Sequence, residues 1–418
     1  MSITTDAWTS VNPTAITGIQ STITSAMADL SQTGGDYRQY LTASYALIGA
    51  QASKNVLSYQ SVLATATDSS VISMASQGIA ENAVALEKLD MTLNLYKYDL
   101  NRPANIIYFT VFALIFIYTV GMSVVSRYHW YNVTYICGYG LEFLGWLGRI
   151  LAMNNVRNNN YYILQFVALT IAPAFIMAGI YFLFAQLVVV HGRAYSILRP
   201  LWYSYLFITC DVVSLLIQAG GGASASIASS RNEDTTTGSN IIIAGIVFQT
   251  VAMTVFLGFY FEFLNRLFFK HRNETESTSP LKKRSFGSFF KLLFNTKSAR
   301  AFKKENDVFY NEKFAHIRSN PLFGYMPLAI TVSVVVIYIR CVYRVVELAE
   351  GWRGHLITTE VYIMVLDALM IAIAGIIAVP FHPYWVFGKA NVVKLATIRK
   401  NLDVHDDSST KEEPSSGQ

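Results

Sequence analysis

The sequence predicts an all-α membrane protein: a bundle of seven transmembrane helices with its N-terminus outside and its C-terminus in the cytosol. The first observation behind this fold class is composition. Hydrophobic residues make up 53% of the 418 residues and charged residues only 14%, about half the charged share of an average soluble domain. With a mean hydropathy of +0.35, the apolar side chains exceed what one soluble core can bury. This composition excludes a soluble globular enzyme, a disordered tail protein and a disulfide scaffold.

The second observation is a series of long apolar segments. Crossing roughly 30 Å of hydrocarbon takes about 20 apolar residues in a helix. Seven segments meet this length, at about 104–125, 131–153, 161–190, 201–220, 241–265, 325–348 and 359–380. Each is therefore predicted to be one membrane-spanning helix.

The third observation is the distribution of Lys and Arg, which are enriched on the cytosolic side of membrane proteins. Placing the N-terminus outside puts 21 of these residues in cytosolic segments and 8 in external ones. The long loop 266–324 alone carries 13. The charge count thus predicts that the N-terminus is outside.

The predicted organisation has three parts. Residues 1–95 form an external N-terminal segment in which 22 of the first 70 residues are Ser or Thr. This composition fits either an O-glycosylated stalk or a weakly helical or disordered tail. Residues 96–390 form the membrane domain, and residues 391–418 form a cytosolic polar tail. The basic, aromatic part of loop 266–324 is either an ordinary cytosolic loop or a surface that lies on anionic inner-leaflet lipid; we expect no nucleic-acid partner.

Polar and ionisable residues inside the spanning segments form the candidate functional site, because such residues are costly in a membrane and usually functional. The candidates are Glu142, Arg149, Asp211, Gln218, Gln249, Arg340, Arg344, Glu347, Glu360 and Asp367. Within single segments they recur at helical spacing, so that each segment would turn one polar face inward. Glu360 and Asp367, for example, lie seven residues apart and would share a face.

These residues include three arginines and five carboxylates. An outward-facing cavity with this excess of negative charge would suit an amphiphile with a cationic head and an apolar tail. The alternative is a purely structural network of ion pairs, such as Glu142 with Arg149 and Arg344 with Glu360, because buried charges must be paired whatever the function.

Two further features bear on mechanism. Pro173 lies in the middle of the third segment, where a proline removes a backbone hydrogen bond and permits a kink, so it is the candidate hinge. The seven histidines lie in loops, helix edges or tails, and neither a phosphate loop nor a G-x-S-x-G element is present. We therefore expect no enzyme activity, no metal and no cofactor.

Four motifs in chain order carry a resemblance to a known family. They are Glu142-Phe-Leu-Gly-Trp-Leu-Gly-Arg149, Leu169-Thr-Ile-Ala-Pro173, the stretch from Asp211 to Gly222, and the stretch from Arg340 to Gly351, followed by Glu360 and Asp367. Together they resemble the fungal lipid-translocating exporters, the seven-helix family named for resistance to an aminocholesterol. The resemblance covers about residues 100–390 and is greatest to the sphingoid long-chain-base exporters.

The resemblance implies a multi-pass plasma-membrane protein that translocates sphingoid bases or similar amphiphilic lipids, phospholipids among them, and confers resistance to toxic amphiphiles. In this hypothesis the protonated amine docks near Asp367 and Glu360, while Arg340 and Arg344 balance the charge of the cavity. The competing hypothesis is a seven-helix sensor or regulator of lipid asymmetry without transport activity. The external segment of roughly 95 residues is longer than the family pattern implies, which leaves room for a second role outside the cell.

Overall fold

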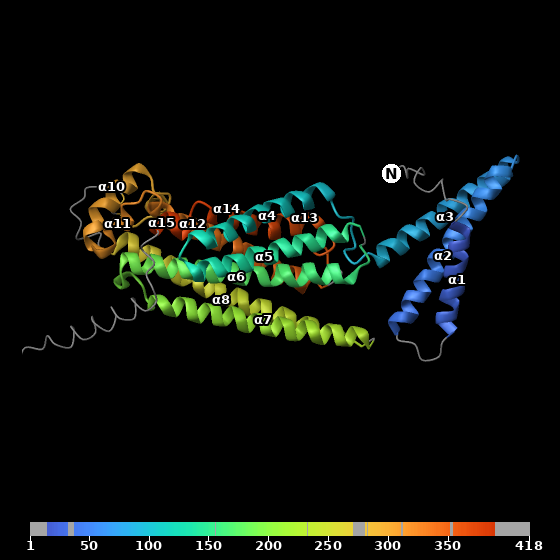
Figure 1. Cartoon of the computed structure of the whole chain (residues 1–418), viewed down its shortest axis with the longest axis horizontal. Coiled ribbons are helices and arrows are strands. Elements are labelled where there is room, and N and C mark those ends of the chain that lie inside the picture. Colours follow the sequence, from blue (N-terminus) through green and yellow to red (C-terminus); the bar gives the residue numbers. More distant parts are fainter. Residues whose placement is uncertain are drawn as a thin grey trace, which may run out of the picture. The chain divides into compact units, whose positions relative to one another are not determined.

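In the computed structural model the described residues are 15–31, 37–154, 156–231, 233–270, 281, 283–310, 312–351 and 354–388. The regular structure over these residues is entirely helical (Figure 1). The chain forms two compact units. Unit 1 comprises Met1–Leu100, Asn155–Asn159 and Gly221–Ser239, and unit 2 comprises the remaining residues.

Unit 1 is built on three helices: α1 (Ala15–Ser31), α2 (Tyr37–Thr65) and α3 (Ser69–Leu93). Helix α2 packs against both of the others. The helices tolerate their many hydroxyl residues because these side chains donate hydrogen bonds to carbonyls in the preceding turn; Ser53 Oγ, for example, lies 2.8 Å from the Gly49 carbonyl oxygen. The described part of residues 1–95 is therefore mainly helical, and the stalk and tail alternatives for this segment stay predictions.

Unit 2 contains the long helices of the bundle, all or most of each lying within it. They are α4 (Arg102–Val125), α5 (His129–Ala152), α6 (Asn159–His191), α7 (Pro200–Ser230), α8 (Thr236–Phe269) and α12 (Met326–Ala349). The last span is composite: α13 (Glu360–Tyr362), the π-helix η7 (Ile363–Ala368) and α14 (Leu369–Ala378). All seven predicted segments are thus helical, and α7 and α8 extend well beyond their predicted ends.

Short helices complete unit 2. They are η2 (Arg193–Tyr195), α9 (Phe286–Leu293), α10 (Lys297–Glu305), η4 (Asn306–Phe309), η5 (Glu312–Phe314), α11 (Ala315–Arg318), η6 (Phe323–Tyr325) and α15 (Pro383–Phe387). Helices α10, α11 and α15 lie at one end of this unit and α13 at the other (Figure 1).

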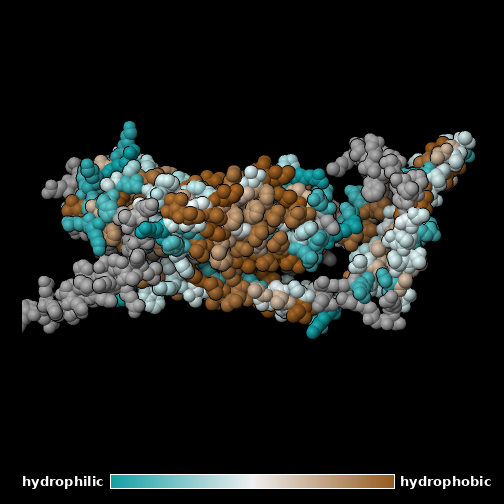
Figure 2. Space-filling view, in the orientation of Figure 1, coloured by the Kyte–Doolittle hydropathy of each residue, from teal (hydrophilic) through white to brown (hydrophobic). Residues whose placement is uncertain are grey.

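Six helical segments in the described part of the chain are long and apolar enough to cross a membrane. They are α4, α6, α7, α8, η6 with α12, and the segment from α13 to α15. Helix α5 has 24 residues but is less apolar, because it carries Glu142, Arg149 and several hydroxyl side chains. Apolar side chains gather over the middle of the bundle and polar ones at its ends (Figure 2), as expected for surface in contact with lipid.

Helix α6 is the centre of the bundle, because its second half is buried on nearly all sides. Phe184 on this helix makes edge-to-face contacts with Tyr203, Phe256 and Tyr260, at ring-centroid distances of 4.8, 5.6 and 5.3 Å. Such aromatic pairs add to the free energy gained by burial. The helix is continuous through the buried Pro173, so the hinge role of that residue stays a prediction.

Helix α5 approaches α6 closely because glycines face it. A Cβ atom added to Gly145 would lie 2.6 Å from Leu169 Cδ2, and one added to Gly138 would lie 2.6 Å from Ile176 Cγ1. Small residues at membrane helix interfaces permit this kind of contact between backbones. The close approach brings the polar face of α5 against the centre of the bundle.

Candidate functional site: a buried network of charges

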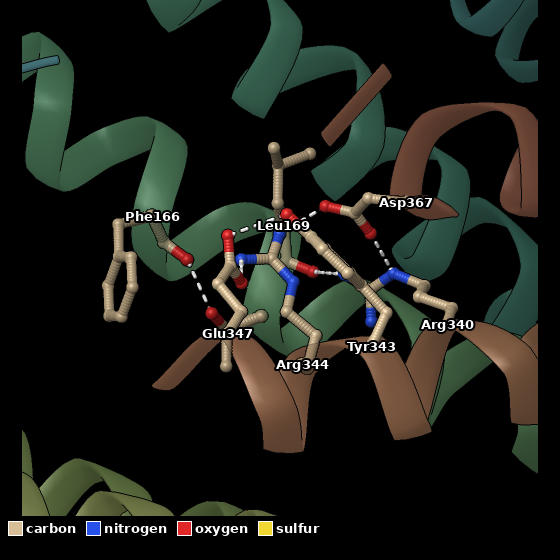
Figure 3. A network of polar contacts seen from close by, with 8 residues as sticks. Phe166, Leu169, Arg340, Tyr343, Arg344, Glu347 and Asp367 are labelled. Atoms are coloured by element: carbon tan, nitrogen blue, oxygen red, sulfur yellow. Dashed lines mark hydrogen bonds and ion pairs between the residues drawn. The ribbon is translucent and has the colours of Figure 1, made fainter. Parts of the chain in front are cut away.

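The site is centred on Asp367, which is held between two arginines of α12. Arg340 Nε donates to one of its carboxylate oxygens and Arg344 Nη2 to the other (Figure 3). Arg340 also donates to the Leu169 carbonyl of α6. All of these polar groups are buried or nearly so, and a buried charge is stable only when it is paired and hydrogen-bonded.

The network continues along α12 to Glu347. Arg344 Nη1 donates to Glu347 Oε2 over 2.9 Å, and Tyr343 OH donates to Glu347 Oε1 over 2.8 Å. Glu347 is therefore satisfied by two neighbours on its own helix, at i−3 and i−4. The spacing of Arg340, Arg344 and Glu347 predicted one polar stripe on this helix, and the structure brings all three into one network.

The π-helical turn η7 positions Asp367 toward α12. A π-helix carries an additional residue per turn, so side chains before and after it no longer keep the α-helical register. As a result Glu360 and Asp367 do not face the same partners: Asp367 contacts α12, whereas Glu360 contacts α4 and α5. An unbroken α-helix would place these two carboxylates on one face, as the seven-residue spacing predicted. With the π-helical turn they face different helices, so that prediction is wrong.

A second cluster lies around Arg149, whose side chain is fully buried. Its Nη2 atom lies 2.6 Å from Glu360 Oε1, and its Nε donates to the Asn105 side-chain oxygen. Glu360 also accepts hydrogen bonds from Asn105 Nδ2 at 2.9 Å and from the Asn101 backbone N–H at 2.8 Å. This cluster ties together the start of α4, the end of α5 and the start of α13.

These contacts correct two predicted pairs. The sequence suggested Glu142 with Arg149 and Arg344 with Glu360, but Arg149 takes Glu360, and Arg344 takes Asp367 and Glu347. Packing between helices, which spacing along one helix does not reveal, decides these partners.

Two further carboxylates are buried without a salt bridge in the described part of the chain. Glu142 of α5 is 2% exposed, and Arg340, Arg344 and Asp367 are close enough to influence it electrostatically. Asp211 of α7 is 5% exposed and lies beside Tyr181 and Cys341. One oxygen of each carboxylate has no hydrogen-bond partner among protein atoms. The three arginines thus form salt bridges with three carboxylates. The other two carboxylates, Glu142 and Asp211, form none with a described residue.

The remaining candidates, Gln218 of α7 and Gln249 of α8, contact each other. Gln218 Nε2 donates to Gln249 Oε1 over 3.3 Å. Both line a cavity of about 20 Å³ together with Arg340 and Arg344. This volume is about that of a single water molecule, so the polar network is closed to a lipid in this conformation.

Three residues of the site were not among the predicted candidates: Asn101, Asn105 and Tyr343. Asn101 and Asn105 were missed because an amide at a helix end is usually read as a cap, and Asn101 indeed caps α4. Tyr343 lies four residues before Glu347, a spacing that indicates contact in a helix. Among the described residues, His, Cys, Asp and Glu form no group that would hold a metal ion.

Comparison with known proteins gives the family. The family model described as "RTA1 like protein" matches residues 135–390. The sphingoid long-chain base transporter RSB1 of Saccharomyces cerevisiae (strain ATCC 204508 / S288c) is 39% identical over 270 residues, which are 64% of this chain and 67% of that protein. No solved structure matches.

Two relatives with lower identity carry other names. Protoporphyrin uptake protein 1 of the same yeast strain is 29% identical over 238 residues, which are 57% of this chain and 63% of that protein. Protein RTM1 of Saccharomyces cerevisiae is 28% identical over 57% of this chain and 62% of its own length. The matched residues 135–390 begin within α5 and contain all ten polar candidates above. The chain belongs to the RTA1-like family of membrane proteins.

Proposed function

We propose that this protein is a plasma-membrane translocase for sphingoid long-chain bases or similar amphiphilic lipids. The proposal is supported by the 39% identity to the yeast transporter and carried by one structural observation. Helices that are apolar enough to cross a membrane enclose a network with more carboxylates than arginines. Ionisable groups at such depth are rare outside pathways for polar or charged substrates.

We extend the proposal to topology. Helix α5 would be the seventh span, with its polar face covered by α4 and α6, so that only its apolar side meets lipid. Residues 1–95 would lie outside, 96–390 would form the membrane domain, and 391–418, which are outside the described residues, would be a cytosolic tail. The distribution of Lys and Arg supports this orientation.

The docking site for the amine is inferred from the salt bridges, because a carboxylate that is already paired with an arginine is not available to bind a second cation. Asp367 and Glu360, the predicted docking residues, are engaged by arginines. We therefore place the protonated amine at one of the two carboxylates that form no salt bridge with a described residue, Glu142 or Asp211, where a cation would supply the missing ion-pair partner. Val212, Val213 and Leu216 beside Asp211 are exposed on α7 and offer an apolar path for the hydrocarbon chain.

Access of a lipid to the polar network requires movement, because the cavity that Gln218 and Gln249 line with Arg340 and Arg344 has a volume of only about 20 Å³. Bending of α6 at Pro173 would separate α6 from Arg340, which is bonded to the Leu169 carbonyl four residues before the proline. The arginines would then be free to exchange partners among the carboxylates as the amine enters. Opening and docking are thus coupled through one set of ion pairs.

A second contact with lipid is proposed at the basic loop. The aromatic rings of Phe286 and Phe290 on α9 and of Phe294, which follows it, lie four residues apart and are exposed, Phe286 by 86%. Lys283 and Arg284 lie just before this helix and are separated from it by Ser285. Exposed rings on one helical face beside cations are typical of a helix that lies on anionic lipid, and the proposed partner is the inner leaflet.

The test is movement of a fluorescent sphingoid base across proteoliposomes that contain the purified protein. Glu142→Gln and Asp211→Asn each remove a carboxylate charge with little change in shape. We expect at least one of them to slow the movement about tenfold or more, as for loss of one hydrogen bond to a charged group. The matched control is Glu262→Gln, because Glu262 forms an exposed ion pair with Arg266 near the end of α8.

The outcomes separate the alternatives. Wild-type rates in both variants would overturn the docking site. Rates no higher than in empty vesicles, from folded protein that still binds the base, would overturn transport and favour the sensor hypothesis.

A further inference from the structure

A second cavity lies at the end of unit 2 where α6 and α8 end and α12 begins. Its volume is about 540 Å³, within the range of small-molecule sites. His191 of α6, Phe268 of α8 and Pro327 of α12 form part of its wall, and α10, η4, α11 and η6 form the rest. It shares no lining residue with the polar network between the spans.

The cavity is strongly basic. Arg300, Lys303, Lys304 and Arg318 line it, against a single carboxylate, that of Asp307. Arg318 is neutralised by Asp307, with Nε and Oδ1 2.5 Å apart. The other three cations have no salt bridge with any described residue. They lie within one turn and a half of α10, and like charges four residues apart, such as Arg300 and Lys304, oppose helix formation.

Lys303 is fixed in place by neutral groups only. Its ammonium donates to Asn295 Oδ1 at 3.1 Å and to the Gly324 carbonyl at 3.3 Å, and lies 5.6 Å from the centre of the Phe268 ring. An ammonium has three donors, so one remains for a ligand. Burial lowers the pKa of Lys303 to about 8, since removal from water disfavours the charged ammonium and Lys303 forms no salt bridge with a described carboxylate.

The backbone around Lys303 is also shaped for this contact. Asn295 follows the end of α9 with φ of 51°, the left-handed conformation that Asn adopts at helix ends. A Cβ atom on Gly324 would lie 2.7 Å from Asn295 Nδ2, so the close approach requires glycine. Two loops that are distant in sequence thus present oxygen acceptors to one lysine.

We propose that this cavity binds a phosphomonoester group, held by Arg300, Lys303 and Lys304. A phosphomonoester carries a charge of about −1.5 to −2 at neutral pH and three acceptor oxygens, which matches three cations that have no carboxylate partner in the described part of the chain. The aromatic wall of Phe268, Tyr310 and Phe323 accommodates the organic part of the ligand. The inference does not depend on the proposed transport of sphingoid bases.

The test is calorimetric titration of the full-length protein in an uncharged detergent. The probes are glycerol 3-phosphate, as a soluble phosphomonoester, and dioctanoyl phosphatidic acid, as a lipid one; dioctanoyl phosphatidylcholine, a zwitterionic diester, is the control ligand. We expect the lipid probe or both phosphomonoesters to bind, and the diester not to. Binding of the lipid probe alone identifies a lipid headgroup as the source, whereas equal binding of both identifies a soluble ligand.

Variants test the assigned residues. Lys303→Met and Lys304→Met should each weaken binding about ten- to hundredfold, the effect of losing one hydrogen bond to a charged group. Lys297→Met is the matched control, because Lys297 is exposed on the same helix and outside the cavity. Lys304 is exposed, so its variant keeps the test valid if Lys303→Met does not fold. Failure of both phosphomonoesters to bind, or equal loss in Lys297→Met and Lys304→Met, would overturn the proposal.

Discussion

Replacing Asp367 by Asn should destabilise the membrane domain strongly, because this one carboxylate neutralises two buried arginines. In the variant Arg344 keeps Glu347 as a partner at 2.9 Å. Arg340 keeps the carbonyl of Leu169 but loses its salt bridge, and the nearby Glu142 forms none with it, so a buried guanidinium is left without a bonded countercharge.

The expected loss is about 3–5 kcal/mol, the cost of removing one partner from a buried ion pair. Glu262→Gln breaks an exposed pair between positions i and i+4, whose side chains are each about 40% exposed. Such pairs contribute about 0.3–0.5 kcal/mol. The two variants should therefore differ about tenfold in effect, although each removes one carboxylate that contacts an arginine.

Cys341 provides the assay, since it is buried beside the network. In a background with Cys137→Ser and Cys210→Ser, a thiol-reactive fluorescent dye reports the unfolding midpoint on heating. The double variant Arg340→Met, Asp367→Leu should recover most of the loss, because an apolar pair replaces a buried ion pair at little cost. Equal midpoints for Asp367→Asn and Glu262→Gln, or no recovery in the double variant, would refute this reasoning.

Three further predictions concern other parts of the molecule. Arg149→Met should lower the free energy of unfolding by about 3 kcal/mol in the same dye assay, because it leaves Glu360 with amide donors only. Gly145→Ala should cost about 1–3 kcal/mol, since its Cβ would lie 2.6 Å from a Leu169 methyl group, whereas Gly121→Ala, in open space, should cost nothing of that kind. Stability should rise from about pH 8 to pH 10.5, because burial lowers the pKa of Lys303 from 10.5 to about 8 and the unfolded chain then binds more protons than the native one. Lys303→Met should flatten this rise, which unfolding midpoints near pH 7 and pH 10 will measure.

The sequence was sufficient to locate the helices of the membrane domain, because apolar length is a direct consequence of membrane thickness. It was less informative about their ends. Helices α7 and α8 continue past the apolar segments into Ser-, Ala- and Thr-rich stretches, where hydropathy falls but helix formation does not. Apolar length measures only the part of a helix that lipid would cover.

The N-terminal helices escaped prediction for a related reason. Their Ser and Thr content indicated a solvated tail, yet Ala, Leu and Gln alternate with the hydroxyl residues in α2 and favour helix. Residues such as Ser53 satisfy their hydroxyls within the helix itself. Composition averaged over 95 residues hides this local compatibility.

For the site, the sequence identified most of the participating residues but not their partners. Arg149 and Glu360 could be identified as candidates without knowledge of their contacts, because ionisable residues are rare within apolar spanning segments. Their pairing depends on how α5 and α13 pack, which no spacing within one helix specifies. The pairing of Arg340 with Asp367 likewise depends on the π-helical turn, and nothing in the apolar run from Ile363 to Ala368 distinguishes it from an α-helix.

That π-helical turn also determines how positions should be matched between relatives. One residue deleted from the six of η7 would restore the α-helical register, and the residues that follow would rotate by about 100° relative to those that precede. A relative with that deletion would therefore place a different residue opposite α12. The residue equivalent to Asp367 in a relative is thus the one that faces the counterparts of Arg340 and Arg344. Where the residue aligned with Asp367 is not acidic, the alignment should be checked for a one-residue gap within 363–368.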